Sequence, residues 1–537
     1  MLEFFKNKIN LTIFLSVLWQ LISVWLISVG VWPIEVVWIN TTLIAVLIAI
    51  LPRVDAVGVF LVSLPFMIIL PNPWLSEFPM WRPLALFLFA VIAIKYLADE
   101  LSRNNLKQVI VNIWKEKVAA WDKWLLVLLI LACISLLFAH FPGHGLKQII
   151  FVLNAYVVYI AARLSVTEEN FHRMLLYLKT SLFICIALGF VQYILTFFEN
   201  PYYFWQYWAT LVSSSYYGQS LGSVLTYSNS WFSSDGGGRA LRMFGILQDT
   251  HAFGVIAMFG LAVHLSLSTV KNSAKEIFKQ GWRFWLVLVL LCFAVVASGT
   301  RGIWIAMLAP IFIALVFAWW YKAKLLTALP LISYAVIIAL FILSPFITMG
   351  LNFLRTVNQD DGFLNRAASI YDLSENSNAG RIEIWQNSLK YATHHLTGTG
   401  YGNFIVSLFP DATSKTYDQL ANQENDRYNL PEKFITAHSL YLHLLVELGL
   451  LGLLLFVIVC LSLALQIFKK IQSLDFKLSK TNLVLLNFGL VISWLLAYGV
   501  FDVTILNERV LLYLMILVAL INFLILDNKE YGSSKSK

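Results

Sequence analysis

LGLLGLLLFVIVCLSLAL, residues 448–465, decides the fold of this chain. These 18 residues contain no charged side chain, and an apolar stretch of this length can cross the hydrocarbon core of a bilayer as a helix. Similar runs of about 17 to 25 residues recur along the chain. They are continuous rather than alternating, which excludes a membrane β-barrel. The sequence therefore predicts an all-α, polytopic integral membrane protein.

The composition supports the same class. Hydrophobic residues make up 59% of the 537 residues and charged residues only 13%, and the mean hydropathy is +0.75. A soluble globular protein is much more polar. Hydropathy predicts a bundle of about 12 to 14 transmembrane helices. The candidate spans are centred near Leu21, Leu43, Leu64, Phe89, Leu131, Val157, Ala187, Gly254, Leu290, Ile311, Ile338, Leu454, Val491 and Leu517.

Basic loops orient these spans. Lysines and arginines gather in residues 103–123, 271–283, 322–324 and 469–480, and such loops face the cytoplasm. Both termini are then cytoplasmic. The opposite side receives Asn200–Arg239 and the longest polar stretch, Asn352–Thr436, which forms the one extracytoplasmic loop subdomain.

The chain is accordingly predicted to have five parts. These are an N-terminal transmembrane bundle (1–198), a transmembrane region with an outer loop and two arginine motifs (199–349), a large extracytoplasmic loop (350–436), C-terminal transmembrane helices (437–527) and a cytoplasmic tail (528–537). The net charge of +8 anchors the inner leaflet, so membrane lipids rather than nucleic acid are the partner it implies. No cleavable signal peptide is evident at the start.

Cysteine usage points to no metal or disulfide chemistry. Each cysteine lies within an apolar span, where it acts as a small hydrophobic residue. The four residues are Cys133, Cys185, Cys292 and Cys460. Scattered acids of the long loop, Asp360, Asp361, Asp411 and Asp418, have no regular metal-ligand spacing.

The outer side, by contrast, is rich in arginine, whose planar guanidinium group suits phosphate or carboxylate recognition. A glycine run, residues 236–238, leads through Arg239 to Arg242 and then into an apolar span. This order predicts Arg242 at the entrance of a membrane helix, beside free N–H groups that favour an anion. The alternative is an arginine that reaches to the membrane surface without a ligand.

A second arginine follows a turn that has no room for a soluble loop, Ser298-Gly299-Thr300-Arg301-Gly302. Arg301 is therefore predicted at the membrane edge, where an unpaired charge costs about 3 kcal/mol. That cost favours an anionic ligand, or an ion pair with an acid such as Asp502 or Glu508.

The long loop contains a third arginine at the start of an amphipathic pattern. The stretch Asn378–Trp385 begins an amphipathic helix, in which Ile382, Trp385 and Leu389 follow helical spacing and Arg381 is predicted in the first turn. A cation in the first turn opposes the helix dipole, so a shared anion would explain it. A solvated surface charge is the alternative. The following Gly398-Thr399-Gly400-Tyr401-Gly402 is interpreted as a tight turn back to the membrane, not as a dinucleotide motif or a potassium filter.

The chain re-enters the bilayer at Thr436-Ala437-His438-Ser439-Leu440-Tyr441. Thr436 is a natural N-cap, which places His438 in the first turn of the next helix. A neutral imidazole beside arginines could accept a proton, so His438 is the candidate general base. It could instead serve only as a hydrogen-bonding cap. His443 and Glu447, one turn apart, are interpreted as a buried structural pair.

This ordered set resembles the O-antigen ligase and polymerase superfamily of bacterial membrane glycosyltransferases. The resemblance runs from Arg242 to Phe456 and closes with Ala437–Leu442 and Glu447–Gly452. It implies a GT-C-like bundle in the bacterial inner membrane, with an active site that faces the periplasm. The donor would be a glycan linked to undecaprenyl diphosphate. The acceptor would be lipid A-core or a growing polysaccharide, and polysaccharide-assembly proteins would be further partners.

The resemblance also implies the roles of individual residues. Arg242, Arg301 and Arg381 would bind the diphosphate, and His438 would activate the acceptor hydroxyl in an inverting reaction without metal or cofactor. Arg239 and Tyr441, from the same motifs, are placed with Arg242 among the substrate-binding residues. His438, Arg301 and Arg381 are the predicted catalytic residues.

Two departures from the family pattern make acceptor positioning less certain than diphosphate binding. Ser439 follows the histidine where many relatives have asparagine, and residues 248–251 replace an Asn-Pro-Asn-like stretch. Whether the chain is a ligase or a polymerase stays open. A flippase for lipid-linked oligosaccharides is the alternative class, although such carriers show repeated halves and polar residues near the midplane.

Overall fold

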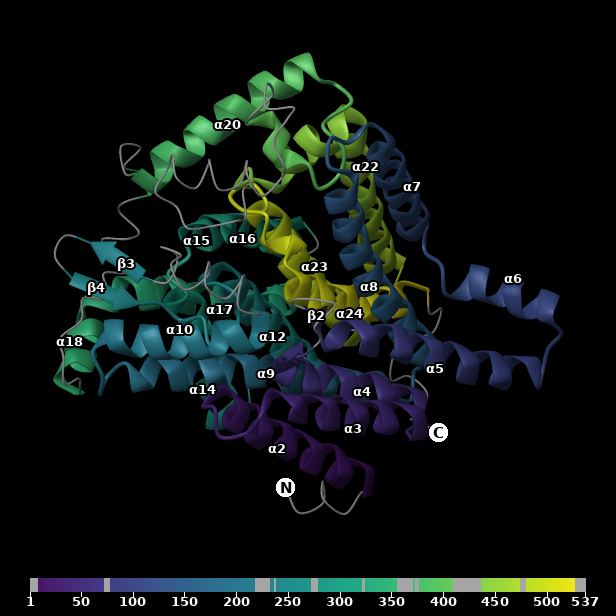
Figure 1. The fold of residues 1–537 in the computed structure, drawn as a ribbon, viewed down its shortest axis with the longest axis horizontal. Helices are drawn as coiled ribbons and strands as arrows, with labels where there is room; N and C mark the ends of the chain where they lie inside the picture. Colours follow the sequence, from purple (N-terminus) through teal and green to yellow (C-terminus); the bar gives the residue numbers. More distant parts are fainter. Residues whose placement is uncertain are drawn as a thin grey trace.

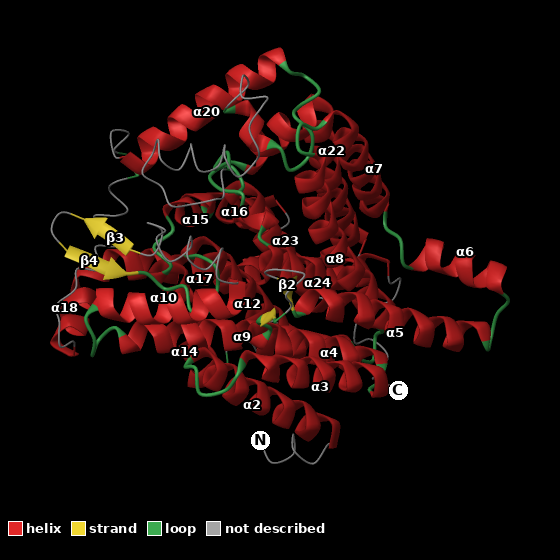
Figure 2. Ribbon diagram, in the orientation of Figure 1, coloured by secondary structure: helices red, strands yellow, loops and turns green. Residues whose placement is uncertain are grey.

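The computed structural model describes residues 8–71, 78–217, 232–235, 238–271, 279–320, 324–354, 370–371, 376–408, 436–473 and 480–526. These residues are almost all helical, and the only strands among them form two short antiparallel pairs (Figure 2). The predicted all-α class is therefore confirmed. The five-part division of the chain stays a prediction.

The N-terminal half runs from α2 to α10. Its elements are α2 (Lys8–Ser28), η1 (Ile34–Val36), α3 (Val37–Ile50), α4 (Arg53–Ser63), η2 (Leu64–Phe66), β1 (Ile69–Leu70), β2 (Phe78–Pro79), α5 (Trp81–Leu101), α6 (Leu106–Glu116), α7 (Ala120–Ser135), η3 (Leu136–Phe138), α8 (Pro142–Ser165), α9 (Phe171–Leu195) and α10 (Pro201–Tyr217). In Figure 1, α2, α3 and α4 form a layer at the bottom of the view and α6 projects from the bundle.

The C-terminal half begins with a β-hairpin. Its elements are β3 (Phe232–Asp235), β4 (Gly238–Leu241), α12 (Thr250–Lys271), α14 (Trp282–Ala297), α15 (Arg301–Ala306), α16 (Leu308–Trp320), α17 (Lys324–Ile342), α18 (Ser344–Leu354), α20 (Asn376–His394), η5 (Phe404–Ser407), α22 (Leu440–Ser473), α23 (Lys480–Tyr498), η6 (Thr504–Leu506) and α24 (Glu508–Leu526). Figure 1 shows α20 across the top of the view, apart from the layer of α2 to α4.

Nine helices of the described residues are long and apolar enough to cross a membrane, and a tenth span results if α17 and α18 count as one bent segment. Two shorter apolar helices, Ile34–Ile50 and Trp282–Ala297, coincide with further predicted spans. The predicted spans near Leu64 and Phe89 fall at the end of α4 and on α5. The chain is a multi-pass membrane protein by these criteria.

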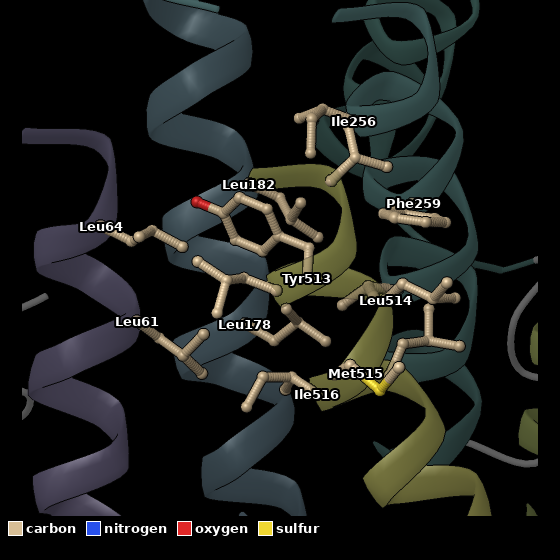
Figure 3. Close-up of a cluster of buried hydrophobic side chains, with 14 of the residues drawn as sticks. Leu61, Leu64, Leu178, Leu182, Ile256, Phe259, Tyr513, Leu514, Met515 and Ile516 are labelled. Carbon is tan, nitrogen blue, oxygen red and sulfur yellow. The ribbon is translucent and has the colours of Figure 1, made fainter. Parts of the chain in front are cut away.

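The core of the bundle surrounds α24 (Figure 3). Tyr513 and Ile516 of this helix are at most 1% exposed, and they pack with Leu178 of α9, Leu61 of α4 and Phe259 of α12. Helix α24 is thus one of the most completely buried helices of the described structure, together with α12.

One membrane helix is interrupted. Inside α22, Gly449 has a φ of 68° and a ψ of −171°, which no residue other than glycine adopts readily. The break frees the carbonyl oxygens of Val446 and Glu447, and the N–H groups of Thr399 and Gly400 donate to them, each at 2.9 Å. The loop after α20 is thus joined to a membrane helix by its backbone.

Candidate functional site

Arg242 lies directly after β4 and is only 5% exposed. Its Nε donates to the Ser298 carbonyl oxygen at 2.9 Å, and its Nη2 donates to Thr300 Oγ1 at 3.1 Å. Between these residues, Gly299 has a φ of +62°, and a Cβ atom there would lie 2.7 Å from Arg242 Nε. The turn requires glycine because the guanidinium group packs directly against it.

The predicted position of Arg242 at a helix entrance is wrong. Helix α12 begins only at Thr250, after the chain has turned at Gly245 with a φ of +59°. Asp249 Oδ1 accepts from the Ala252 N–H at 2.6 Å and so caps the helix. The Asp249 carboxylate therefore caps the N-terminus of α12, and Arg242 belongs to the turn of Ser298–Thr300.

Arg301 begins α15 and is 8% exposed. Ser298 ends α14 as its C-cap and Thr300 is the N-cap of α15, so the predicted turn between two apolar runs is confirmed. Because Arg242 binds Thr300, the residue just before Arg301, the turn brings the two predicted arginines into one place.

The acids proposed as ion-pair partners of Arg301 contact other side chains. Asp502 Oδ2 lies 3.3 Å from His251 Nδ1. Glu508 Oε1 accepts from Arg82 Nη2 at 2.6 Å. These contacts join the segment between α23 and α24 to α12 and α5.

Arg381 lies in α20, but not in its first turn. The helix begins at Asn376, ahead of the predicted start at Asn378, so Arg381 lies beyond the first turn and the argument from the helix dipole does not apply to it. Trp385 of the same helix donates from its Nε1 to the Ala437 carbonyl oxygen, beside His438, at 2.9 Å. Helix α20 therefore carries a third arginine toward the same end of the bundle.

His438 lies two residues before α22, which begins at Leu440. The prediction of His438 in the first helical turn is wrong, because its φ of 45° is incompatible with a right-handed helix. Thr436 still acts as a local cap, since its Oγ1 accepts from the His438 N–H at 3.3 Å. The His438 Nδ1 lies 4.0 Å from Asp502 Oδ2 and has no hydrogen-bond partner among the described residues.

Asp502 is the acid on which two histidines converge. One oxygen, Oδ1, accepts from the Thr504 N–H at 2.9 Å and from the Thr504 hydroxyl. The other, Oδ2, faces His251 and His438. Burial favours the neutral acid, but the pKa of Asp502 still lies well below its usual value, because His251, His438 and the Thr504 hydroxyl stabilise the carboxylate.

Sequence reasoning missed His251 and Tyr498. The Tyr498 hydroxyl lies 2.5 Å from His251 Nδ1, and the same nitrogen lies 3.3 Å from Asp502 Oδ2. Both residues stand at the end of an apolar span on the predicted outer side. A search of span ends for titratable residues would have found them, but not their contact.

The predicted tight turn at residues 398–402 is confirmed. Gly398, Gly400 and Gly402 all have positive φ, between 75° and 89°, and the turn docks on the break in α22. The predicted pair of His443 and Glu447 is also confirmed, with Nε2 and Oε1 3.4 Å apart.

This pair holds the loop as well as the helix. Glu447 Oε1 also accepts from the backbone N–H of Phe404, at 3.1 Å. Helix α22, which follows His438, is therefore fixed to the loop that follows α20.

Tyr441 and Arg239 are the remaining predicted substrate-binding residues. The Tyr441 hydroxyl donates to the Leu496 carbonyl oxygen at 2.7 Å, a structural contact with α23. Arg239 lies in β4, opposite Ser234, and its side chain is outside the described residues. The loop acids Asp360, Asp361, Asp411 and Asp418 and the tail are also outside them. No group of three or more His, Cys, Asp or Glu in the described part of the chain could hold a metal ion.

Residues 286–457 match the sequence model of a family described as O-Antigen ligase. Over this stretch, called the ligase-like domain below, the chain is similar to that family. It extends from α14 into α22 and contains Arg301, Arg381 and His438, whereas Arg242, His251 and Asp502 lie outside it. No curated protein sequence matches the chain.

The match and the apolar helices together make the chain similar to membrane glycosyltransferases of the O-antigen ligase and polymerase type. Such an enzyme uses a lipid-linked glycan donor and an acceptor. The site described above joins the domain to residues on both sides of it, since Arg242 binds the α14–α15 turn and Asp502 faces His438.

Proposed function

We propose that the protein transfers a glycan from undecaprenyl diphosphate to an acceptor hydroxyl, of lipid A-core or of a growing polysaccharide, at the periplasmic face of the inner membrane. One observation carries the proposal. Arg242 binds Thr300, whose hydroxyl contacts the Thr250 carbonyl oxygen next to His251, and the Asp502 carboxylate faces both His251 and His438. Cations and an acid–base pair are the two parts that this reaction needs.

The arginines bind the diphosphate. As the glycosidic bond breaks, negative charge develops on the leaving diphosphate, and fixed cations in a water-poor site stabilise it strongly. Arg242 is pre-positioned by Ser298 and Thr300, so it loses little freedom when the donor binds. Arg301, at the start of α15, and Arg381, on α20, supply the further positive charge.

His438 is the general base. Its Nδ1 faces Asp502 Oδ2, which leaves Nε2 to take the proton of the acceptor hydroxyl. The depressed pKa of Asp502 keeps the carboxylate ionised, and an ionised carboxylate stabilises the imidazolium that forms. A shift of about 1 Å would close the 4.0 Å gap to hydrogen-bond distance.

The reaction is a direct displacement. The acceptor oxygen forms a bond to the anomeric carbon while the bond from that carbon to the diphosphate oxygen breaks. The acceptor proton passes to His438, and undecaprenyl diphosphate leaves with the electron pair. Attack from the face opposite the leaving group inverts the anomeric configuration.

The test uses a bacterial strain that lacks this gene and carries plasmid copies of the wild type, His438→Ala, Arg301→Ala and Arg242→Ala. Surface polysaccharide and lipid-linked precursor are compared on gels after membrane insertion has been verified. We expect at least a roughly hundredfold loss of product for each variant. Arg283→Ala is the matched control, because Arg283 lies at the other end of α14 from Ser298.

The precursor that accumulates also identifies the acceptor. Full-length chains left on the lipid carrier indicate a ligase, and single repeat units indicate a polymerase. Wild-type product from His438→Ala would overturn the role of the base. Wild-type product from all three variants would overturn the transferase mechanism and favour a flippase.

A further inference from the structure

His438 has an unusual backbone. It is the one residue other than glycine with a positive φ among the described residues, at 45°. Such a conformation costs free energy and persists only where neighbouring groups hold it. The residues that hold it therefore determine where the imidazole lies.

Both polar atoms of the peptide between Ala437 and His438 are bound. The His438 N–H donates to Thr436 Oγ1 at 3.3 Å, and the Ala437 carbonyl oxygen accepts from the indole Nε1–H of Trp385 at 2.9 Å. Ala437 is fully buried, so water cannot readily replace the indole. With both ends fixed, this peptide cannot rotate freely, and the adjoining φ of His438 is constrained.

Trp385 lies four residues after Arg381 in α20. Side chains four residues apart lie on the same face of a helix, one turn from each other. Arg381 and the residue that contacts the peptide of His438 therefore belong to one rigid segment. In Figure 1 this helix crosses the top of the view, and it packs against α22.

We propose that Trp385 is a positioning residue that couples the diphosphate-binding arginine of α20 to the general base. Its indole N–H holds the Ala437–His438 peptide, and through it the imidazole, in register with Arg381. The inference rests on the proposed function, in which Arg381 binds donor and His438 activates acceptor. Packing of the indole ring does not by itself require its N–H group, whereas the proposed positioning role does.

Phenylalanine at this position separates the two roles of the side chain. An apolar cluster already holds α20 over this region, because Ile384 and Tyr391 pack against Ala437 and Phe404. Trp385→Phe keeps a smaller aromatic ring at this position and removes the donor. The helix should stay docked while the peptide of His438 loses one of its two partners.

The experiment is a double-mutant cycle in the deletion strain. It uses the full-length wild type, Trp385→Phe, His438→Ala and the double variant, and it measures incorporation of radioactive sugar into polysaccharide after induction. We expect Trp385→Phe to lower the rate roughly tenfold in the wild-type background and to have no further effect in the His438→Ala background. The unfolding temperature of the purified Trp385→Phe protein should stay near that of the wild type.

Trp19→Phe is the matched control. The Trp19 Nε1 also donates a single hydrogen bond, to Asn40 Oδ1 at 2.8 Å, but between α2 and α3. It should change incorporation by less than about twofold in either background.

The outcomes separate the inference from the proposed function. If His438→Ala is inactive and Trp385→Phe retains the wild-type rate, the positioning role is wrong and the proposed function stands. The same conclusion follows if Trp385→Phe lowers the rate equally in both backgrounds, because a structural defect would add to the loss of the base. If His438→Ala has the wild-type rate, both proposals fail.

Discussion

Helices α22 and α24 carry similarly apolar sequences but are held in different ways. In α24, 89% of the membrane-spanning window is buried inside the protein, whereas only 33% is buried in α22. Helix α24 is continuous and packs with α4, α9 and α12. Helix α22 is interrupted at Gly449 and binds the loop after α20 through backbone hydrogen bonds.

The difference separates a helix that supports the fold from one that supports the site. A helix buried on all sides is stabilised by packing, which is insensitive to any one polar contact. A helix at the periphery has less packing, so a few directional bonds decide its position. Because His438 lies just before α22, the position of the base depends on those bonds.

The largest expected effect comes from Gly449→Ala. A Cβ atom at this position would lie 2.1 Å from the Leu396 carbonyl oxygen, and the backbone conformation suits glycine alone. We expect about 3 kcal/mol or more of destabilisation, together with loss of transfer activity. The unfolding temperature of the detergent-purified protein and the surface polysaccharide of the strain would be measured.

Gly489→Ala in α23 is the control for this variant. A Cβ atom there would meet only Ile467 Cγ2, at an ordinary contact distance of 3.6 Å, and alanine favours a helix. Equal unfolding temperatures for the two variants would show that the break in α22 is not needed for stability.

An intermediate effect is expected from removing one tyrosine hydroxyl from each region. Tyr513 of α24 bonds Ser181 Oγ at 2.7 Å, and Tyr498 at the end of α23 contacts His251 at 2.5 Å. Each Tyr→Phe substitution should cost about 1 kcal/mol of stability. Only Tyr498→Phe should also lower polysaccharide synthesis, because only His251 belongs to the site. A fall in synthesis with Tyr513→Phe would contradict the separation of core and site.

The smallest effect concerns the charged segment that leads into α24. The folded-state pKa of Asp502 is depressed, so its stabilising contribution is complete above the carboxyl value of the unfolded chain, about 4. That contribution is lost as pH falls through the lower folded-state value. The difference in unfolding temperature between wild type and Asp502→Asn should therefore stay constant from pH 8 to 5 and shrink only below about pH 4. A difference that already shrinks between pH 7 and 5 would mean that the carboxylate is not stabilised.

Much of the fold could be predicted, because membrane insertion leaves its record in local composition. The apolar runs of α22 and α24 are visible in the sequence, since each span must be apolar over its own length. The length of α3 and α4 was harder to foresee. Short apolar helices that pack against neighbours have the same hydropathy as true spans.

The site was only partly predictable. The turn at Ser298–Gly302 and the glycine turn after α20 could be predicted from glycine spacing and from an arginine at a membrane edge. The convergence of His251 and His438 on Asp502 could not be predicted, because these residues come from three distant segments. Their meeting depends on how α12, α22 and α24 pack, which no local pattern encodes.

The break at Gly449 also limits how this protein can be recombined with its relatives. Two carbonyl groups of α22 stay unpaired until the loop after α20 binds them, and an unpaired backbone group within an apolar helix is costly. The loop after α20 and helix α22 therefore have to be exchanged together. A chimera that exchanges residues 376–473 as a block preserves the junction, whereas one that divides the block brings together two surfaces that were never fitted to each other.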